Sequence, residues 1–314
     1  MSLLILFSRH FFAVILAVTI YSATSSATPV TQSNKADQLK KINRYLQLAA
    51  TDRQQGKFDR AITHYQLAIK YAQKYYGSDT LFVSGIYHFL GRAYASNKEY
   101  KLAAETINKG LKIKLKHLPK DDPKLSGDYI NLGIVYQMSE QLNKSVTVLD
   151  KAIMILKKQY GEKHPKVAIA YLNIGVSFKK LGNLPKAIDY YKKALAITET
   201  RFKLHHPYNI SAYHNLGAAY FQKDDDDNAI KYLEKALKQQ LKIKPLDHAK
   251  VAIESEFLGK VYLRKKQYKK AVVYFKIVHN TNIIRYGKDN KQTLASLKQL
   301  NAAIKTQFSL PTKQ

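Results

Sequence analysis

The sequence repeats itself every 42 residues, and this period constrains the fold more than any other feature. Six rows of 42 residues align without an insertion or deletion between residues 38 and 289. A period of 20 to 50 residues is typical of repeat proteins, in which each unit packs mainly against its neighbours. We therefore give each residue a column number, from 1 to 42, within its row. The rows are 38–79, 80–121, 122–163, 164–205, 206–247 and 248–289.

Each row predicts two helices. Apolar or small residues in columns 4, 8, 11, 12 and 15 have the spacing of one face of a helix, which we name helix A. Columns 21, 24, 25, 28, 31 and 32 predict a longer second helix, helix B. Column 12 is Gly in five rows and column 24 is Ala in five rows, so helices A and B of a row can approach closely. We expect the aromatic residues of columns 8 and 15 to fill space against the next row.

The rows must stack, because a pair of helices cannot bury its apolar face alone. Residues 290–308 continue the helix A pattern without a helix B and are expected to form a capping helix, followed by a tail at 309–314. The apolar positions of this last segment are Leu294, Leu297, Leu300, Ala303 and Ile304. The predicted fold class is therefore all-α, a solenoid of six helix-turn-helix repeats with a C-terminal capping helix.

The N-terminus predicts export. A weakly basic start, the apolar run 11–20 and small residues around Ala27 match a secretory signal peptide, so we expect residues 1–27 to be removed and 28–37 to be a linker. An uncleaved membrane anchor is the less favoured alternative, since Arg9 and His10 leave the apolar stretch short of the ~20 residues that a span needs. The predicted location is periplasmic or secreted. The absence of cysteine suits an oxidising compartment.

Two stretches carry a resemblance to a known family. HPKVAIAYLNIGVSF (164–178) and KAIDYYKKALAITE (186–199) resemble the tetratricopeptide repeat, in the 42-residue form of the kinesin light chain subtype. The His-Pro pairs at 164–165 and 206–207 match the start of that repeat. The resemblance covers residues 38 to 308, although the export signal and the lack of a long coiled coil favour an exported bacterial protein over a motor light chain. It implies a right-handed superhelix with helix A along a concave groove.

The same resemblance indicates a peptide-binding groove. Column 10 is Asn131, Asn173 and Asn215 in three successive rows, and a carboxamide can both donate to and accept from a peptide backbone. The alternative is that these residues belong to the repeat consensus and hold neighbouring helices. The other groove candidates, from columns 9 and 13, are His88, Arg92, His214 and Lys260. The Lys, Asn and Arg pattern of carboxylate-clamp repeats is absent there, which disfavours recognition of chaperone tails.

Charge suggests a second kind of partner. Lys and Arg number 52 against 23 Asp and Glu, a formal charge of +29. Column 30 of helix B forms a basic face of Lys109, Lys151, Lys193 and Lys235. Such a face can bind an anionic envelope polymer or a membrane surface, or it can be an ordinary solvated surface. No aromatic and basic nucleic-acid motif accompanies it, so nucleic acid is an unlikely partner.

Nothing in the sequence predicts catalysis. HExxH, P-loop and GxSxG motifs are missing, so we expect a protein that is not an enzyme and needs no cofactor or metal. His164, His206 and His248 stand at row starts and are interpreted as helix-start residues. The acidic run 224–227 lacks the spacing of a calcium loop and is expected to cap helix B of row five. The predicted function is an extracytoplasmic, non-enzymatic scaffold that binds a protein or peptide partner.

Overall fold

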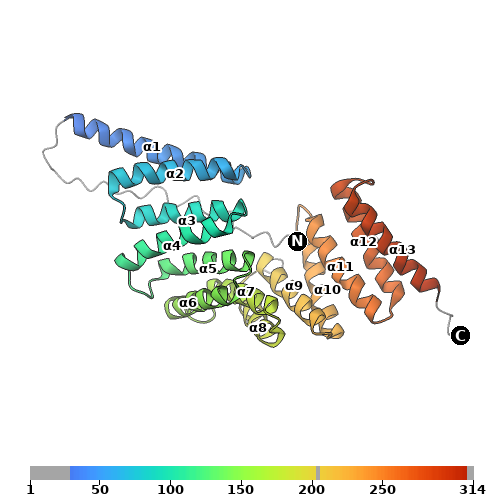
Figure 1. Cartoon of the computed structure of the whole chain (residues 1–314). Coiled ribbons are helices and arrows are strands. Elements are labelled where there is room, and N and C mark those ends of the chain that lie inside the picture. Colours follow the sequence, from blue (N-terminus) through green and yellow to red (C-terminus); the bar gives the residue numbers. More distant parts are fainter. Residues whose placement is uncertain (1–28, 203–205, 310–314) are drawn as a thin grey trace. The chain divides into compact units, whose positions relative to one another are not determined.

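A computed structural model describes residues 29–202 and 206–309, and these residues form helices and turns without a strand (Figure 1). The prediction of an all-α repeat fold is confirmed. The A helices are α1 (Pro29–Gln54), α3 (Leu81–Ser96), α5 (Pro123–Met138), α7 (Pro165–Lys180), α9 (Pro207–Gln222) and α11 (His248–Arg264). The B helices are α2 (Phe58–Tyr76), α4 (Tyr100–His117), α6 (Leu142–Tyr160), α8 (Leu184–Arg201), α10 (Asp226–Gln240) and α12 (Tyr268–Tyr286), and α13 (Lys291–Phe308) follows them.

The chain divides into two compact units between His117 and Leu118, a division that the uniform 42-residue period did not predict. Unit 1 contains α1 to α4, and unit 2 contains α5 to α13. Within each unit, every helix A packs on the helix B of its own row and on the helix B of the preceding row where that row belongs to the unit. In unit 2, successive A helices also contact one another. We name the surface that these A helices share the inner face.

The glycine of column 12 sets the distance between the two helices of a row. A Cβ atom on Gly91 would lie 2.4 Å from Ile107 Cγ1, and one on Gly175 would lie 2.5 Å from Tyr191 Cε1. Ile107 and Tyr191 both occupy column 28 and are fully buried. The equivalent pairs are Gly133 with Leu149, Gly217 with Leu233 and Gly259 with Phe275. In these five rows, a larger residue in column 12 would push the side chain of column 28 out of its place.

The aromatic rings of columns 8 and 15 stack on helix B of their own row, and their hydroxyl groups reach helix B of the preceding row, so the predicted direction, toward the next row, was wrong. Gln66 Nε2 donates a hydrogen bond to Tyr94 Oη at 2.8 Å, and Tyr262 Oη donates to Glu234 Oε1 at 2.8 Å. Both partners lie on the helix B before the tyrosine. The reason is the stacking order, because a helix A lies between the B helices of the preceding row and of its own row.

The first helix begins earlier than expected. The prediction of a linker at residues 28–37 was wrong, because α1 already starts at Pro29. A proline is compatible with the first turn of a helix, and residues 30–37 contain no further Gly or Pro to end it. The predicted signal peptide 1–27 lies outside the described residues.

The acidic run 224–227 caps α10, as expected, and also ties row five to row six. Asp225 Oδ1 accepts a hydrogen bond from the backbone N–H of Asn228 at 3.2 Å. Its three neighbours bind the C-terminal end of α11. The pairs are Arg264 with Asp224 and Asp226, and Lys265 with Asp227.

Two row-start histidines cap the helices that follow them. His164 Nδ1 accepts a hydrogen bond from the backbone N–H of Lys166 at 3.2 Å, and His206 Nδ1 accepts from that of Tyr208 at 3.2 Å. An imidazole nitrogen can accept only when it carries no proton. Burial lowers the pKa of both rings, and the charges of Lys166 and Arg201 lower that of His164 further.

The third row-start histidine, His248, does not cap its helix. His248 is the first residue of α11, and the cap there is Asp247, which accepts from the backbone N–H of Lys250 at 3.2 Å. The prediction that these histidines start helices is confirmed, while the capping role belongs to two of the three.

Two glycines of α3 should respond oppositely to replacement by alanine. Gly91→Ala should destabilise by about 1–3 kcal/mol, because its methyl group overlaps Ile107. Gly85→Ala, in the same helix with nothing within 4 Å, should stabilise by roughly 0.5–1 kcal/mol through helix propensity. Thermal and urea unfolding measure both changes. Equal effects of the two substitutions would contradict the packing role of column 12.

The histidine caps should make stability depend on pH. Because the folded pKa values lie below the unfolded value of about 6.5, the caps stabilise fully above that pH and lose their effect as the pH falls through the folded values. The double variant His164→Asn and His206→Asn keeps a cap acceptor that does not titrate, so its unfolding midpoint should fall less between pH 7.5 and pH 5 than that of the wild type, each cap being worth about 0.5–2 kcal/mol. Parallel pH profiles would refute this role.

Candidate functional site

The inner face of unit 2 presents the predicted asparagine column, with a different accessibility at each row. Asn131 and Asn173 are half-buried, whereas Asn215 is only 5% exposed. Asn173 Nδ2 donates to the backbone oxygen of Ile169 in its own helix at 2.9 Å. Asn215 Oδ1 is buried, and no described residue donates a hydrogen bond to it. The column therefore combines a structural role with unused hydrogen-bonding capacity.

In two row pairs of unit 2, a side chain in column 16 of one A helix contacts column 10 of the next A helix. Gln137 Nε2 donates to the backbone oxygen of Asn173 at 2.6 Å, and the rings of Phe221 and Phe257 meet edge to face at 5.7 Å. Both pairs join column 16 of one row to column 10 of the following row. By the same register, we expect Lys179, in column 16 of α7, to lie near Asn215, in column 10 of α9.

Lys179 is a cation of this face that was not among the residues predicted for the groove. Its side chain is half-buried. Burial lowers the pKa of its ammonium group, and the neighbouring charge of Lys180 lowers that pKa further. Within residues 29–202 and 206–309 no carboxylate forms an ion pair with Lys179, whereas Lys180 pairs with Glu140 at 2.7 Å. The only sequence signal was its column, which holds Arg53, Ala95, Gln137, Phe221 and Leu263 in the other rows.

His214 and Lys260, also predicted for the groove, have carboxylate partners. His214 Nδ1 lies 2.8 Å from Oε1 of Glu254, which is only 3% exposed. Lys260 is exposed and its Nζ lies 2.6 Å from Glu256 Oε1. His214 belongs to the packed contact between α9 and α11, and Lys260 to the solvated surface of α11.

His88 and Arg92, the remaining groove candidates, lie on α3 in unit 1. The ring of His88 meets that of Phe89 edge to face at 5.4 Å. Burial, together with the nearby charge of Arg53, lowers the pKa of Arg92 to about 10. Both candidates therefore belong to unit 1 and not to the inner face of unit 2.

The predicted basic face is exposed on all four B helices concerned. Lys109, Lys151, Lys193 and Lys235 are each exposed. The Nζ atoms of Lys151 and Lys235 lie 5.8 Å and 5.3 Å from the ring centres of column 8 tyrosines in the same rows. Among these four, the described residues provide an acidic partner only for Lys193, in Asp189 at 2.7 Å. The tyrosine contacts steady lysine stems while the ammonium groups stay in solvent.

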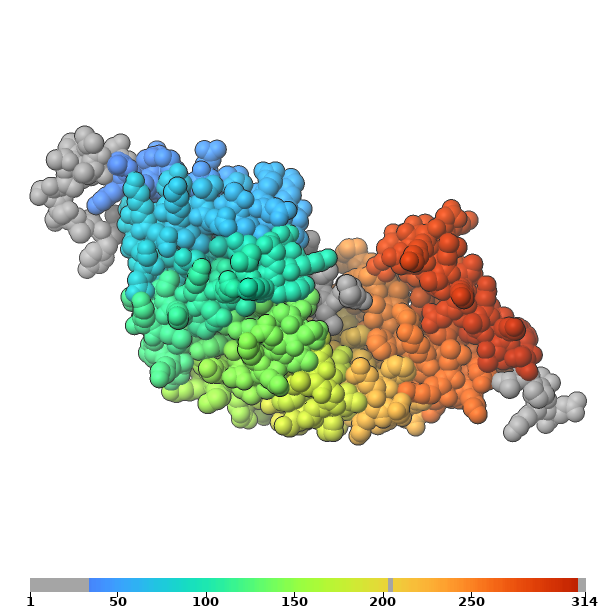
Figure 2. Space-filling model, viewed as in Figure 1, coloured from blue at the N-terminus to red at the C-terminus, as the bar shows by residue number. Residues whose placement is uncertain are grey.

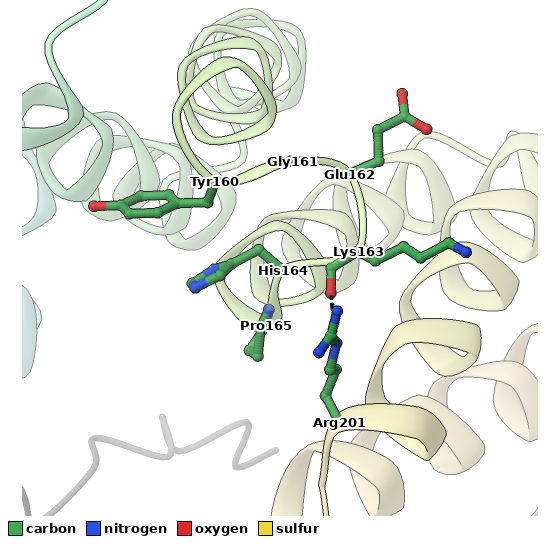
Figure 3. Close-up of a pocket in the computed structure, with 7 residues that line it drawn as sticks. All are labelled: Tyr160, Gly161, Glu162, Lys163, His164, Pro165 and Arg201. Carbon is green, nitrogen blue, oxygen red and sulfur yellow. Dashed lines mark hydrogen bonds between the residues drawn. The ribbon is translucent and has the colours of Figure 1, made fainter.

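A hollow at the turn between α6 and α7 offers no separate site. Figure 3 shows its lining residues, with Glu162 pointing away from the ring of His164. They are Tyr160, Gly161, Glu162, Lys163, His164, Pro165 and Arg201. Arg201 Nε donates to the backbone oxygen of Lys163 at 3.3 Å, and His164 caps α7, so the polar groups already serve the turn.

Residues 29–202 and 206–309 contain no group of three His, Asp or Glu side chains placed to hold a metal ion. None of the helices there combines the length and the apolar character needed to cross a membrane.

Several solved structures have similar folds. BtubC (BKLC) from P. vanneervenii is 20% identical, with a TM-score of 0.61, and the match covers 84% of this chain and 95% of that one. A putative kinesin light chain from Podosopora anserina with nearly identical TPR-like repeats is 22% identical, with a TM-score of 0.57, over 65% and 97%. The apo form of RapI is 16% identical, with a TM-score of 0.61, over 85% and 97%. These likenesses show the fold alone.

The sequence itself matches a family description. No curated protein matches it significantly. The tetratricopeptide repeat family matches residues 42–116, 128–200 and 208–280, which is most of the part that the 42-residue rows occupy. Repeats of this family generally form non-catalytic scaffolds that mediate protein–protein interactions. Together with the paired helices and the glycine contacts of every regular row, this match shows that the chain belongs to the tetratricopeptide repeat family.

Proposed function

We propose that this protein is a non-enzymatic scaffold that binds an extended peptide segment of a partner protein on the inner face of unit 2, outside the cytoplasm. The observation that carries the proposal is Lys179, a half-buried cation without a carboxylate partner among the described residues, in the face that bears the asparagine column. The location rests on the signal-like sequence of residues 1–27.

The chemistry of this face favours a peptide with an acidic side chain. An ammonium group that has lost part of its hydration is stabilised by a nearby carboxylate, which would raise its pKa again. The carboxamides of Asn131 and Asn173 have the donor and acceptor needed for a peptide backbone. At Asn215, a buried acceptor without a donor costs about 1–3 kcal/mol, so a ligand or water N–H or O–H group there would recover free energy.

Peptides selected from a random display library on the purified protein should be acidic and should depend on Lys179. Lys179→Met should weaken their binding by about tenfold or more, because a charge-assisted hydrogen bond to a partly buried group is lost. The double variant Asn131→Ala and Asn173→Ala should weaken it as well. Isothermal titration calorimetry gives the affinities.

The matched control for Lys179→Met is Lys151→Met on a B helix, where the lysine is exposed. This variant should bind the selected peptides like the wild type. If Lys179→Met and the asparagine variant, both correctly folded by circular dichroism, retain full affinity, the inner face is not the binding site.

The alternative function is electrostatic binding to an anionic envelope polymer or membrane surface through the basic face. This alternative is favoured by the distribution of the acidic residues, because many of them form ion pairs with a basic residue of an adjacent row. Lys116 pairs with Asp79 at 2.9 Å, for example, and Lys180 with Glu140 at 2.7 Å. The column 30 lysines are therefore left largely to solvent, where an anionic surface can neutralise them.

This alternative predicts a steep salt dependence. Binding to vesicles that contain anionic phospholipid should weaken sharply between low and physiological ionic strength, because each neutralised charge releases counterions. Replacing Lys151, Lys193 and Lys235 together by Gln should flatten that dependence, whereas Lys179→Met should leave it unchanged. A flat salt profile of the wild type, measured by vesicle co-sedimentation, would exclude the basic face as a binding surface.

A further inference from the structure

The last described helix, α13, occupies a helix A position, and the described residues contain no helix B after it. α13 packs against α12 through Thr293, Ser296, Leu300 and Ala303. By the column numbering, Leu297 and Ile304 fall in columns 8 and 15. In the complete rows, these columns pack against helix B, as where the rings of Tyr220 and Tyr232 stack at 5.6 Å. Within residues 29–202 and 206–309 no further helix follows α13 to cover this side (Figure 1).

The uncovered side of α13 carries an apolar stripe. Leu294 is 52% exposed, Leu297 36% and Phe308 78%, and Ile304 is half-buried. The spacing of these four residues puts them on one face of the helix, next to the face that contacts α12. A terminal helix of a solenoid normally has a polar outer face. Figure 2 shows α13, in red, at the surface of unit 2.

A row of lysines borders the apolar stripe. Lys291, Lys298 and Lys305 are seven residues apart, which aligns them along the helix, and all three are exposed. α13 contains no Asp or Glu. A partner surface must therefore be apolar along its centre and acidic along one border. A second copy of this chain is disfavoured, since two such faces would bring their lysines together.

The centre of the stripe also restricts the partner. Column 12 of α13 is Asn301, which is exposed, where the preceding five rows have glycine. In those rows the glycine makes room for a large side chain of column 28 on helix B. Asn301 leaves no such room, so a helix that lies here needs a small residue at the equivalent position.

We propose that the outer face of α13 docks an acidic amphipathic helix of a partner protein, which lies on α13 as helix B lies on helix A and carries a small residue opposite Asn301. The apolar stripe supplies the buried contact, and the bordering lysines select a partner of negative charge. This surface is distinct from the inner face, and its occupant is a helix instead of an extended peptide.

A peptide derived from helix B of row four provides the probe. The acidic peptide has the sequence of residues 184–201 with Lys186, Lys192 and Lys193 replaced by Glu and Tyr191 by Ala, and the basic peptide carries only Tyr191→Ala. Fluorescence anisotropy with the purified protein should show that the acidic peptide binds about tenfold or more tightly than the basic one, because its charge complements the lysines. Restoring Tyr191 in the acidic peptide should weaken its binding. Failure of the acidic peptide to bind would overturn the proposal.

Variants of the protein test the contribution of α13 to the same contact. Leu297→Glu should weaken binding of the acidic peptide by about tenfold or more, because the substitution places a charge in the apolar centre of the stripe. The double variant Lys298→Glu and Lys305→Glu should reverse the preference and bind the basic peptide. Met154→Glu, at an apolar residue of α6 that is 71% exposed, is the matched control and should bind like the wild type. An unchanged preference in the charge-reversed protein would overturn the proposal.

Two other occupants of the stripe give distinct results. If a second copy covers it, sedimentation will show a concentration-dependent dimer that Leu297→Glu abolishes. If residues 1–28 of the same chain cover the stripe, cross-linking from Lys298 will reach that segment. The peptide will then bind only after residues 1–28 have been removed. Either result would overturn the docking of an acidic partner helix. Because all substituted residues of α13 are exposed, each variant should keep the wild-type thermal unfolding midpoint.

Discussion

The contact between the glycine of column 12 and the large side chain of column 28 determines how every regular row is built. It brings helices A and B so close that a single added methyl group would overlap Ile107 or Tyr191. Once this distance is set, the aromatic rings of columns 15 and 27 can stack, and the tyrosine hydroxyls reach the preceding helix B. The stacking of rows, and with it the inner face, follows from one close approach repeated along the chain.

Because the packing is the same in each row, function is expected where a row departs from its column. Lys179 stands in a column without another lysine, and Asn301 in a column that is otherwise Gly in five rows and Ala in the first. One departure leaves a poorly hydrated charge on the inner face, and the other closes the space that a large side chain would need. Both departures change which ligand can bind, and neither disturbs the contacts that hold the helices together.

Much of the fold was predictable because each apolar position recurs at the same column. The bounds of the helices from α2 to α9 follow the periodicity closely. The linker prediction failed at Pro29, where no chemical signal separates a first helical turn from an extended segment. The column 8 and 15 aromatics were correctly chosen but assigned to the wrong neighbour, because a repeat shows which residues are buried and not which adjacent row buries them.

The sequence by itself determined the repeat length, the two helices of each row, the glycines that bring them together and the asparagine column. These features are local or periodic, so they can be seen without knowing which rows touch. The tertiary structure alone decided that the buried Oδ1 of Asn215 receives no hydrogen bond from the described residues, that Lys179 is half-buried without an acidic partner among them, and that apolar residues of α13 stay exposed. Burial and pairing depend on side chains about 40 residues apart, and no single row contains that information.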